Sequence, residues 1–166
     1  MERRELFNSF TSSFRSDSKD EVKESIIRPP YYTELEDFSK LCVACEDKSC
    51  VSVCEEDIIF IMDDGTPKLD LTTSTGCTFC DECAIACEPD VLQVDRMRKI
   101  DALIEIDILK CLSWHQTMCF SCKEPCLENA IDFLGMFRPT IDQNKCTSCG
   151  FCVYRCPSNA ITIKGV

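Results

Sequence analysis

The sequence has few of the residues that most enzymes and nucleotide-binding proteins use for their chemistry. It contains one histidine and five glycines among 166 residues. No glycine-rich phosphate loop, no paired carboxylates and no nucleophile–base set stands out. No apolar run approaches the roughly eighteen residues that a membrane-spanning helix requires. We therefore expect no membrane span and no catalysis beyond electron movement, so the chain is not predicted to be an enzyme.

Positive charge is also scarce. Lys and Arg number 18 against 29 Asp and Glu, which gives a formal net charge of −11. Because nucleic-acid binding depends on neutralising phosphates with Lys and Arg, this balance argues against a nucleic-acid partner. It favours a basic patch on a protein partner, although plain solubility explains it equally well. The one basic run, Arg96–Lys99, is interpreted as a solvated linker rather than a binding patch.

Cysteine, by contrast, is abundant. The apolar fraction of 45% includes 16 cysteines, so the remaining apolar side chains form a thin core that metal or disulfides must supplement. Arg3 and Arg4 form a twin arginine near the start, but no apolar stretch of the length of an export signal follows. We therefore expect a cytoplasmic protein, and in that compartment clustered cysteines indicate metal.

The segment from Cys146 to Pro157 reads C-x2-C-x2-C-x3-C-P, the run with which bacterial-type ferredoxins hold [4Fe–4S] clusters. Three thiolates on one tight loop can bind three irons of a cluster, while the fourth points to the neighbouring cluster. Zinc is the poorer alternative, because a structural zinc ion usually takes two separated C-x2-C pairs.

Four such quartets together account for all the cysteines. They are Cys42, Cys45, Cys50 and Cys54; Cys77, Cys80, Cys83 and Cys87; Cys111, Cys119, Cys122 and Cys126; and Cys146, Cys149, Cys152 and Cys156. The second quartet has the standard spacing. The first has two extra residues before its third cysteine, and the third has an insertion between its first two. We predict four [4Fe–4S] clusters of iron held by these thiolates.

The quartets form an internal repeat. Cys42 and Cys111 are 69 residues apart, and so are Cys77 and Cys146. Alternating apolar residues between the quartets predict short strands over 58–62, 68–71, 104–108, 130–134, 140–142 and 160–163. The predicted fold is α+β, with tandem two-cluster, bacterial ferredoxin-like units of small hairpins and short helices around the clusters. We expect a cysteine-free N-terminal segment (1–36), a first unit (37–95), a connector (96–102) and a second unit (103–166).

In such a unit the last cysteine of each quartet serves the other cluster. The favoured sets are Cys42, Cys45, Cys50 and Cys87; Cys77, Cys80, Cys83 and Cys54; Cys111, Cys119, Cys122 and Cys156; and Cys146, Cys149, Cys152 and Cys126. The competing arrangement pairs the outer quartets with each other and the inner quartets with each other. The equal spacing of the repeat argues against it.

Two features outside the quartets leave alternatives open. An apolar stripe at helical spacing, formed by Leu6, Phe7, Phe10 and Phe14, either packs on the body of the protein or docks a partner or an interface. Trp114 and His115 lie in the insertion of the third quartet. A histidine can replace a cysteine on iron, but the cysteines already suffice, so loop packing is favoured for His115.

With the quartets placed, the chain resembles the NapF-type ferredoxins of the periplasmic nitrate reductase system. The motifs that carry the resemblance are Ile27–Pro30, Cys77–Pro89, Cys119–Cys126, Phe137–Pro139 and Cys146–Pro157. The four-residue gap between Cys45 and Cys50 departs from the two residues usual in that family. The resemblance implies a cytoplasmic accessory protein with four [4Fe–4S] clusters that binds the precursor of the nitrate reductase catalytic subunit and aids its maturation before export.

Two functions from different classes therefore remain open. The first is the maturation factor implied by the resemblance. The second is an electron carrier that delivers electrons to a redox enzyme, which the cysteine pattern alone supports equally well. A purely structural role for the metal is the third reading.

Overall fold

Short helices and two-stranded sheets make up the part of the chain that the computed structural model describes, residues 25–73 and 75–166. The helical segments are α2 (Leu35–Asp37), a π-helical turn (Phe38–Cys42), α3 (Ser49–Ser52), α4 (Glu82–Ile85), a 3-10 turn (Leu112–His115) and α5 (Phe151–Tyr154). The strands are β1 (Ile59–Ile61), β2 (Pro67–Leu69), β3 (Ala102–Ile106), β4 (Ile131–Leu134), β5 (Phe137–Ile141) and β6 (Ile161–Gly165). The helix predicted around Leu6–Phe14 lies outside the described residues.

The strands pair as three antiparallel ladders, β1 with β2, β4 with β5 and β3 with β6. These ladders confirm the predicted strands, with ends that differ by a few residues. The turn expected over 135–139 is shorter than predicted, because the left-handed backbone of Gly135 (φ +70°) closes it early and Pro139 continues β5 opposite Phe133. Ile108 lies beyond the end of β3 and is exposed.

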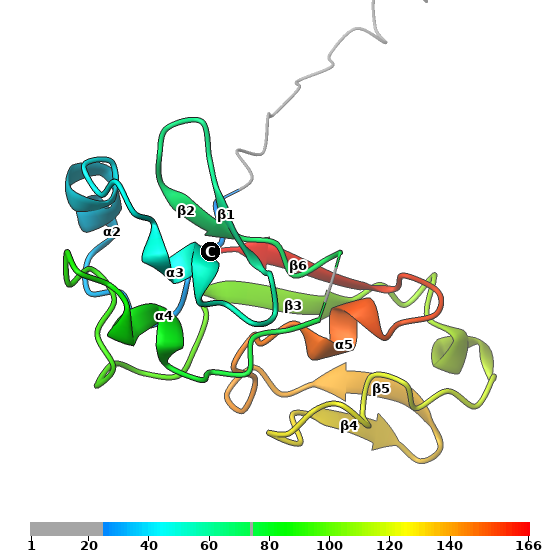
Figure 1. The fold of residues 1–166 in the computed structure, drawn as a ribbon. Coiled ribbons are helices and arrows are strands. Elements are labelled where there is room, and N and C mark those ends of the chain that lie inside the picture. Colours follow the sequence, from blue (N-terminus) through cyan, green and yellow to red (C-terminus); the bar gives the residue numbers. More distant parts are fainter. Residues whose placement is uncertain (1–24, 74) are drawn as a thin grey trace, which may run out of the picture.

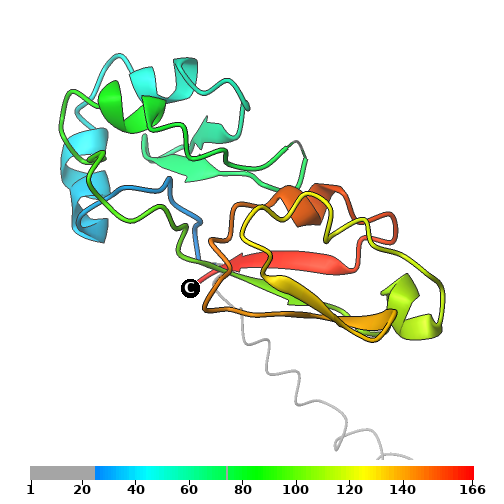
Figure 2. The same ribbon diagram turned by 90° about the horizontal axis from the view of Figure 1, so that it is seen from below.

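Each half of the chain forms one lobe, and the two lobes lie side by side in both ribbon views (Figures 1 and 2). The first half contains α2, α3, α4 and the β1–β2 hairpin. The second contains α5 and the β4–β5 hairpin. The β3–β6 ladder lies between the two hairpins, and the C-terminus ends beside the first half (Figure 1).

The counterpart of the β3–β6 ladder in the first half is one isolated bridge between Tyr32 and Leu92. A further backbone hydrogen bond joins Gln93 N–H to the carbonyl oxygen of Tyr31 at 2.9 Å. The ladder does not extend further toward the N-terminus because Pro29 and Pro30 have no N–H to donate. The same positions in the second half carry the full β3–β6 ladder.

The third quartet differs from the other three in the described part of the chain, since no helix directly precedes its last cysteine. Residues 121–125 form consecutive turns instead. Pro125 explains the difference, because a proline at this position cannot donate the hydrogen bond that a helical turn needs. The other three quartets have the expected single helical turn, in α3, α4 and α5.

Two small hydrophobic clusters replace a single large core. The first surrounds Phe38, Ile58, Leu71 and Val91, and the second surrounds Ile104 and residues of α5 and β6. Cysteines pack within both clusters. Among the residues that the structure describes, no helix has the length and apolarity that crossing a membrane would need.

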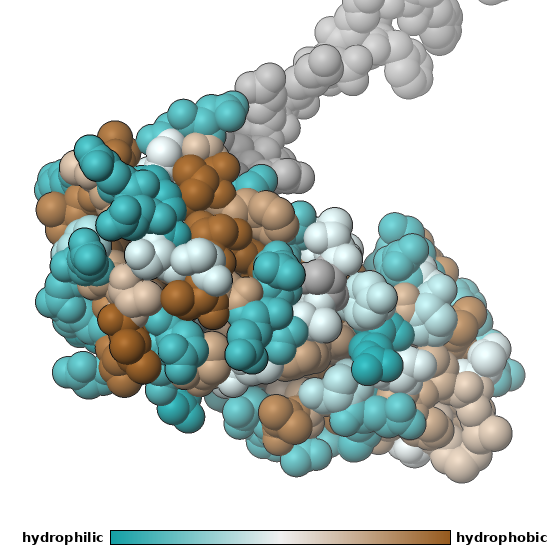
Figure 3. All heavy atoms as spheres, viewed as in Figure 1, coloured by the Kyte–Doolittle hydropathy of each residue, from teal (hydrophilic) through white to brown (hydrophobic). Residues whose placement is uncertain are grey.

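Some apolar side chains remain on the surface. Hydrophobic spheres gather over the lobe that carries β1, β2 and α3 (Figure 3). Val43, Phe60 and Ile61 are among the exposed apolar residues of that lobe.

Candidate metal centres

Two cavities of the first half are lined by cysteines from both of its quartets. One cavity is lined by Cys42, Cys45, Cys50 and Cys87. The other is lined by Cys54, Cys77, Cys80 and Cys83. Each cavity thus combines three cysteines of one quartet with the last cysteine of the other.

The second half repeats this arrangement. One cavity is lined by Cys111, Cys119, Cys122 and Cys156. Another is lined by Cys126, Cys146, Cys149 and Cys152, with Cys77 of the first half on its wall. All sixteen cysteines are free thiols. The structure therefore brings together the same sets of four that the tandem repeat predicts, and it does not bring together the sets of the competing arrangement.

The loops of the second and fourth quartets curl in the same way because they share two left-handed positions. Phe79 (φ +53°) and Asp81 (φ +67°) occupy the places that Ser148 (φ +57°) and Gly150 (φ +90°) occupy 69 residues later. Alternation of right- and left-handed residues turns successive backbone N–H groups toward one side and makes an anion-binding concavity. Such a concavity suits a negatively charged cluster with its thiolates.

A second conformational repeat follows every quartet and was missed by the sequence analysis. The third residue after each last cysteine has a left-handed backbone; these residues are Asp57, Asp90, Asn129 and Asn159, with φ between +49° and +58°. In each case its N–H donates to the carbonyl oxygen of that cysteine at 3.1 or 3.2 Å. Asp and Asn adopt this conformation more readily than other non-glycine residues. An Asp or Asn at the same offset in all four quartets was the signal in the sequence.

In the second half this turn also directs a hydrogen bond to sulfur. The N–H of Ala130 lies 3.3 Å from Cys126 Sγ, and the N–H of Ala160 lies 3.2 Å from Cys156 Sγ. Donors of this kind stabilise a thiolate. Burial alone would raise the pKa of Cys156, but hydrogen bonds from Ala160 and Ser158 outweigh it and lower that pKa.

The pKa values of the other shifted thiols all move in the opposite direction. Burial, assisted by the neighbouring Cys87 and Cys42, raises the pKa of Cys50 to about 11. Burial likewise raises the pKa of Cys77 to about 12 and that of Cys122 to about 11. Four closely spaced thiolates repel one another and resist ionisation unless a positively charged group lies among them.

The donor set fits iron–sulfur clusters on these grounds. Thiolates are the ligands that such clusters take, and each cavity is lined by at least four cysteines, with curled loops at the second and fourth quartets. The described part of the chain contains no group of three or more His, Cys, Asp or Glu side chains that could hold a single metal ion.

The two extra residues of the first quartet contribute a lysine that the sequence analysis did not single out. Lys48 has a left-handed backbone (φ +47°) and begins the turn that leads into α3. Its ammonium group donates to the carbonyl oxygens of Cys42 and Gly65, the latter at 2.9 Å. The insertion thus joins the first cysteine loop to the β1–β2 turn.

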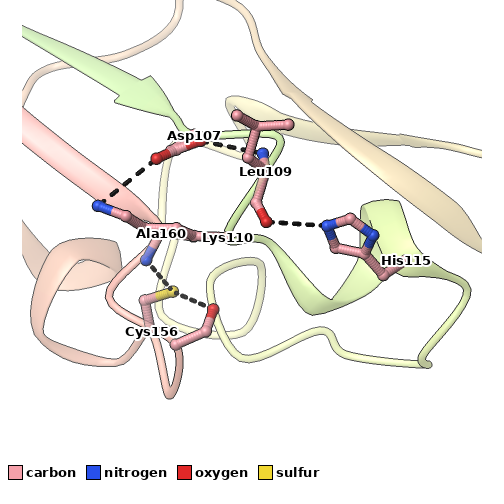
Figure 4. A network of polar contacts seen from close by, with 7 residues as sticks. Asp107, Leu109, Lys110, His115, Cys156 and Ala160 are labelled. Atoms are coloured by element: carbon pink, nitrogen blue, oxygen red, sulfur yellow. Dashed lines mark hydrogen bonds and ion pairs between the residues drawn. The ribbon is translucent and has the colours of Figure 1, made fainter.

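The insertion of the third quartet packs against the protein, which is the interpretation favoured for His115. The indole Nε1 of Trp114 donates to the carbonyl oxygen of Pro139 at 3.2 Å, and Arg138 lies over its ring. His115 Nε2 lies 2.9 Å from the carbonyl oxygen of Leu109 (Figure 4). Figure 4 also shows the hydrogen bond that Cys156 Sγ accepts from the Ala160 N–H beside this loop. His115 points to Leu109 and not to this sulfur atom.

The basic run of the connector is exposed, as predicted for a solvated linker. One of its members nevertheless has a defined partner. Arg98 forms an ion pair with Asp81 at 2.9 Å, and Arg98 also lines the cavity of the fourth quartet. The connector is therefore attached to the loop of the second quartet, where an exposed ion pair contributes at most about 1 kcal/mol.

Known proteins with similar sequences include several that are named as ferredoxin-type proteins. The pattern of the family described as "4Fe-4S binding domain" matches residues 139–162. The "Ferredoxin-type protein NapF" of Escherichia coli K12 is 30% identical over 82% of this chain and 83% of its own length. The protein of the same name from Haemophilus influenzae is 36% identical, over 82% of this chain and 78% of its own length. The "Methylamine utilization ferredoxin-type protein MauM" of Methylorubrum extorquens is 30% identical over 88% of this chain and 74% of its own length.

Proposed function

Since the chain belongs to the family of NapF ferredoxin-type proteins, we propose that it is an accessory protein with four [4Fe–4S] clusters that assists maturation of the periplasmic nitrate reductase catalytic subunit. In this proposal it binds the precursor of that subunit in the cytoplasm, before export. The proposal has two parts, the clusters and the partner, and each has its own support and its own test.

The clusters are supported by one observation above all, the crossed lining of the four cavities. Each cavity takes three cysteines from one quartet and the last cysteine of another, and the cavity of the fourth quartet has Cys77 on its wall as well. The proposed ligand sets are Cys42, Cys45, Cys50 and Cys87; Cys54, Cys77, Cys80 and Cys83; Cys111, Cys119, Cys122 and Cys156; and Cys126, Cys146, Cys149 and Cys152. Burial of thiols alone would not select this combination of cysteines from two quartets. Two-cluster ferredoxins require it, because the last cysteine of each quartet binds the other cluster.

The chain's own residues have definable tasks around such clusters. The thiolates hold the iron, and the curled loops direct backbone N–H groups toward the negative charge. The N–H groups of Ala130 and Ala160 reach sulfur directly. Hydrophobic neighbours such as Ile131 and Ile141 line the cavity of the fourth quartet and limit access of water. A bound cluster supplies the ability to carry one electron.

The test of the clusters is anaerobic purification of the whole chain with counting of iron and inorganic sulfide. We expect about sixteen irons and about sixteen sulfides per chain, with cluster signals in electron paramagnetic resonance (EPR) spectra after reduction. About four zinc ions without sulfide would show that the cavities serve another metal. Paired cysteines in the native protein would exclude both.

The partner is supported by family membership and by the charge of the chain. The formal net charge of −11 suits a basic surface on another protein. The test is capture of the nitrate reductase catalytic precursor by the tagged, cluster-loaded chain in cytoplasmic extract. We expect capture of the precursor with its export signal and no capture of the mature form. Undiminished nitrate reductase maturation in cells that lack this chain would contradict the proposal.

Electron transfer is the second candidate function, and one specific observation favours it. The loops of the second and fourth quartets, one from each half, are in direct backbone contact, with Cys77 N–H donating to the carbonyl oxygen of Cys149 at 2.7 Å. A maturation factor has no need of such a connection. Rapid reduction and reoxidation of the loaded chain by a redox partner would support this candidate, whereas clusters inert to every donor would contradict it.

A further inference from the structure

The contact between the two halves lies where two cysteine-lined cavities meet. Cys77, Thr78 and Phe79 line the cavity of the second quartet and also that of the fourth. One short segment therefore forms a common wall between a cavity of the first half and a cavity of the second.

The wall is thin because glycine allows the backbones to touch. Gly76 is buried, and a Cβ at this position would lie 2.5 Å from the carbonyl oxygen of Cys149 and 2.6 Å from the backbone nitrogen of Phe151. Real Cβ atoms do not approach backbone atoms this closely. Gly150 provides a second close approach, since a Cβ there would lie 2.9 Å from Leu71 Cβ. At Gly76 the two cysteine loops thus meet through their main chains, next to the Phe151 side chain, whereas Gly150 lies against the Leu71 side chain.

Three hydrogen bonds hold this geometry. Cys77 N–H donates to the carbonyl oxygen of Cys149 at 2.7 Å. Ile100 N–H donates to the carbonyl oxygen of Thr147 at 3.0 Å. The Ser148 hydroxyl, which is 1% exposed, donates to the carbonyl oxygen of Ala102 at 2.5 Å. The three residues up to and including Cys149 are therefore held by hydrogen bonds to Cys77 of the first half, to the connector and to the first residue of β3.

We propose that the Cys77–Cys149 contact is the electron bridge between the two halves of the chain, so that electrons pass between the second-quartet and fourth-quartet cavities and not through solvent. This inference rests on the cluster part of the proposed function. Covalent bonds and a hydrogen bond connect the cysteines of the two cavities, and electronic coupling falls far more steeply across an open gap than along such a connection. The cavities of the first and third quartets then form the two ends of a four-member chain.

The step moves a single electron. With clusters bound in the two cavities, the one held by Cys54, Cys77, Cys80 and Cys83 would be oxidised as the one held by Cys126, Cys146, Cys149 and Cys152 is reduced, or the reverse, and no bond or proton would be transferred. The electron comes from a low-potential one-electron reductant. This assignment makes Gly76 and Ser148 positioning residues, because both act through the geometry of the contact and neither lines a cysteine cavity.

The experiment uses the full, cluster-loaded chain and two glycine variants. Gly76→Ala places a methyl group against the Cys149 carbonyl, whereas Gly135→Ala is the control, because a Cβ at Gly135 would meet no atom within 4 Å. After iron and sulfide are counted, each protein receives less than one electron per chain from flash-generated reductant, and freeze-quenched EPR spectra follow its redistribution among the clusters. We expect a phase independent of protein concentration in the wild type and in Gly135→Ala, slowed at least tenfold in Gly76→Ala.

Two results would overturn the bridge. One is the absence of a concentration-independent phase in wild-type protein that holds its full iron. The other is an unchanged rate of electron redistribution in Gly76→Ala protein that holds its full iron. If Gly76→Ala loses iron, Ser148→Ala takes its place, because it removes the hydrogen bond to Ala102 without adding an atom. We expect this variant to slow the redistribution at least twofold. An unchanged rate would overturn the bridge. Failure of the wild type to hold about sixteen irons contradicts the proposed function itself and is seen before any rate is measured.

Discussion

The ammonium group of Lys48 donates a hydrogen bond to the carbonyl oxygen of Gly65 at 2.9 Å, and a second one to the carbonyl oxygen of Cys42. It thereby places a positive charge, half-buried, beside the cavity of the first quartet, on whose wall it lies. This charge acts on Cys42. Burial raises the pKa of Cys42, and the charge of Lys48 opposes that rise. A cation in this position stabilises the more negative, reduced form of a cluster.

Replacing Lys48 should therefore lower the reduction potential of one cluster. In Lys48→Met we expect a fall on the order of 50 mV, about 1 kcal/mol for a one-electron couple, confined to one of the four clusters. A potentiometric titration followed by EPR measures it. Lys68→Met, an exposed site on β2 in the same lobe, removes an equal charge and should change the potential by much less. Equal shifts in the two variants would show that only net charge matters.

Replacement of the last cysteine of each quartet in the first half by serine should show to which cavity that cysteine belongs. We expect Cys87→Ser to alter the same EPR signal as Cys45→Ser, because both side chains line the cavity of the first quartet. Cys54→Ser should instead alter the signal that Cys80→Ser alters. Each variant should lose about four of about sixteen irons, or retain a three-iron remnant. Grouping of Cys87 with Cys80 instead would contradict the crossed ligand sets.

The sequence was informative about the cysteines because the local spacing of cysteines determines which thiols can bind the same metal centre. A C-x2-C step and a repeat of 69 residues are enough to predict which thiols come together, and alternating residues such as Ile104 and Ile106 were enough for the strands. The ends of these strands were harder to predict, because Pro67 and Pro139 were assigned to turns and yet continue β2 and β5. A proline is tolerated where its missing N–H would face away from the partner strand.

The relation between the two halves could not be predicted in the same way. Gly76 and Gly150 have no side chains, so no hydrophobic or charge pattern marks the place where the cysteine loops meet. The role of Lys48 was hidden for a similar reason, since a lysine in a charged loop is usually solvated. Contacts made by the main chain across long sequence separations leave no periodic signal.

Tyr32 and Asp101 connect the start of the first half to the start of β3. The Tyr32 hydroxyl donates to the Asp101 carboxylate. Burial, followed by this hydrogen bond, raises the pKa of Tyr32 to about 12. We expect Tyr32→Phe to lose about 0.5–1 kcal/mol of unfolding free energy at pH 7, since the bond is exposed to solvent. Chemical denaturation of the loaded chain measures the loss.

The same pair predicts a pH dependence of known sign. A phenol whose pKa is raised on folding stabilises the protein below the unfolded pKa of about 10, and this contribution is lost as the pH rises toward 12. The difference between wild type and Tyr32→Phe should therefore be constant below pH 9 and shrink between pH 10 and 12. Tyr154→Phe, at an exposed position on α5, serves as the control. A difference that grows with pH would contradict the assignment.

Asn159 holds the left-handed turn that follows the last cysteine of the chain, with φ +49°. The turn directs the next N–H, that of Ala160, to Cys156 Sγ at 3.2 Å. A β-branched residue is strained in this conformation, whereas glycine adopts it freely. We expect Asn159→Val to lower the unfolding free energy by about 1–2 kcal/mol and to release iron faster from one cluster, while Asn159→Gly stays within about 0.5 kcal/mol of the wild type. Thermal denaturation and iron release to a chelator measure the two effects.

The control for this turn is Asn144→Val. Asn144 is exposed and its φ is not positive, so the substitution adds a β-branched side chain without left-handed strain. It should change neither stability nor iron release by more than the Asn159→Gly variant does. If Asn159→Val and Asn144→Val behaved alike, the Asp or Asn at this offset in all four quartets would have no role in holding the cysteine loops. A loss specific to Asn159→Val, rescued by glycine, would assign that role to the backbone conformation and not to the amide side chain.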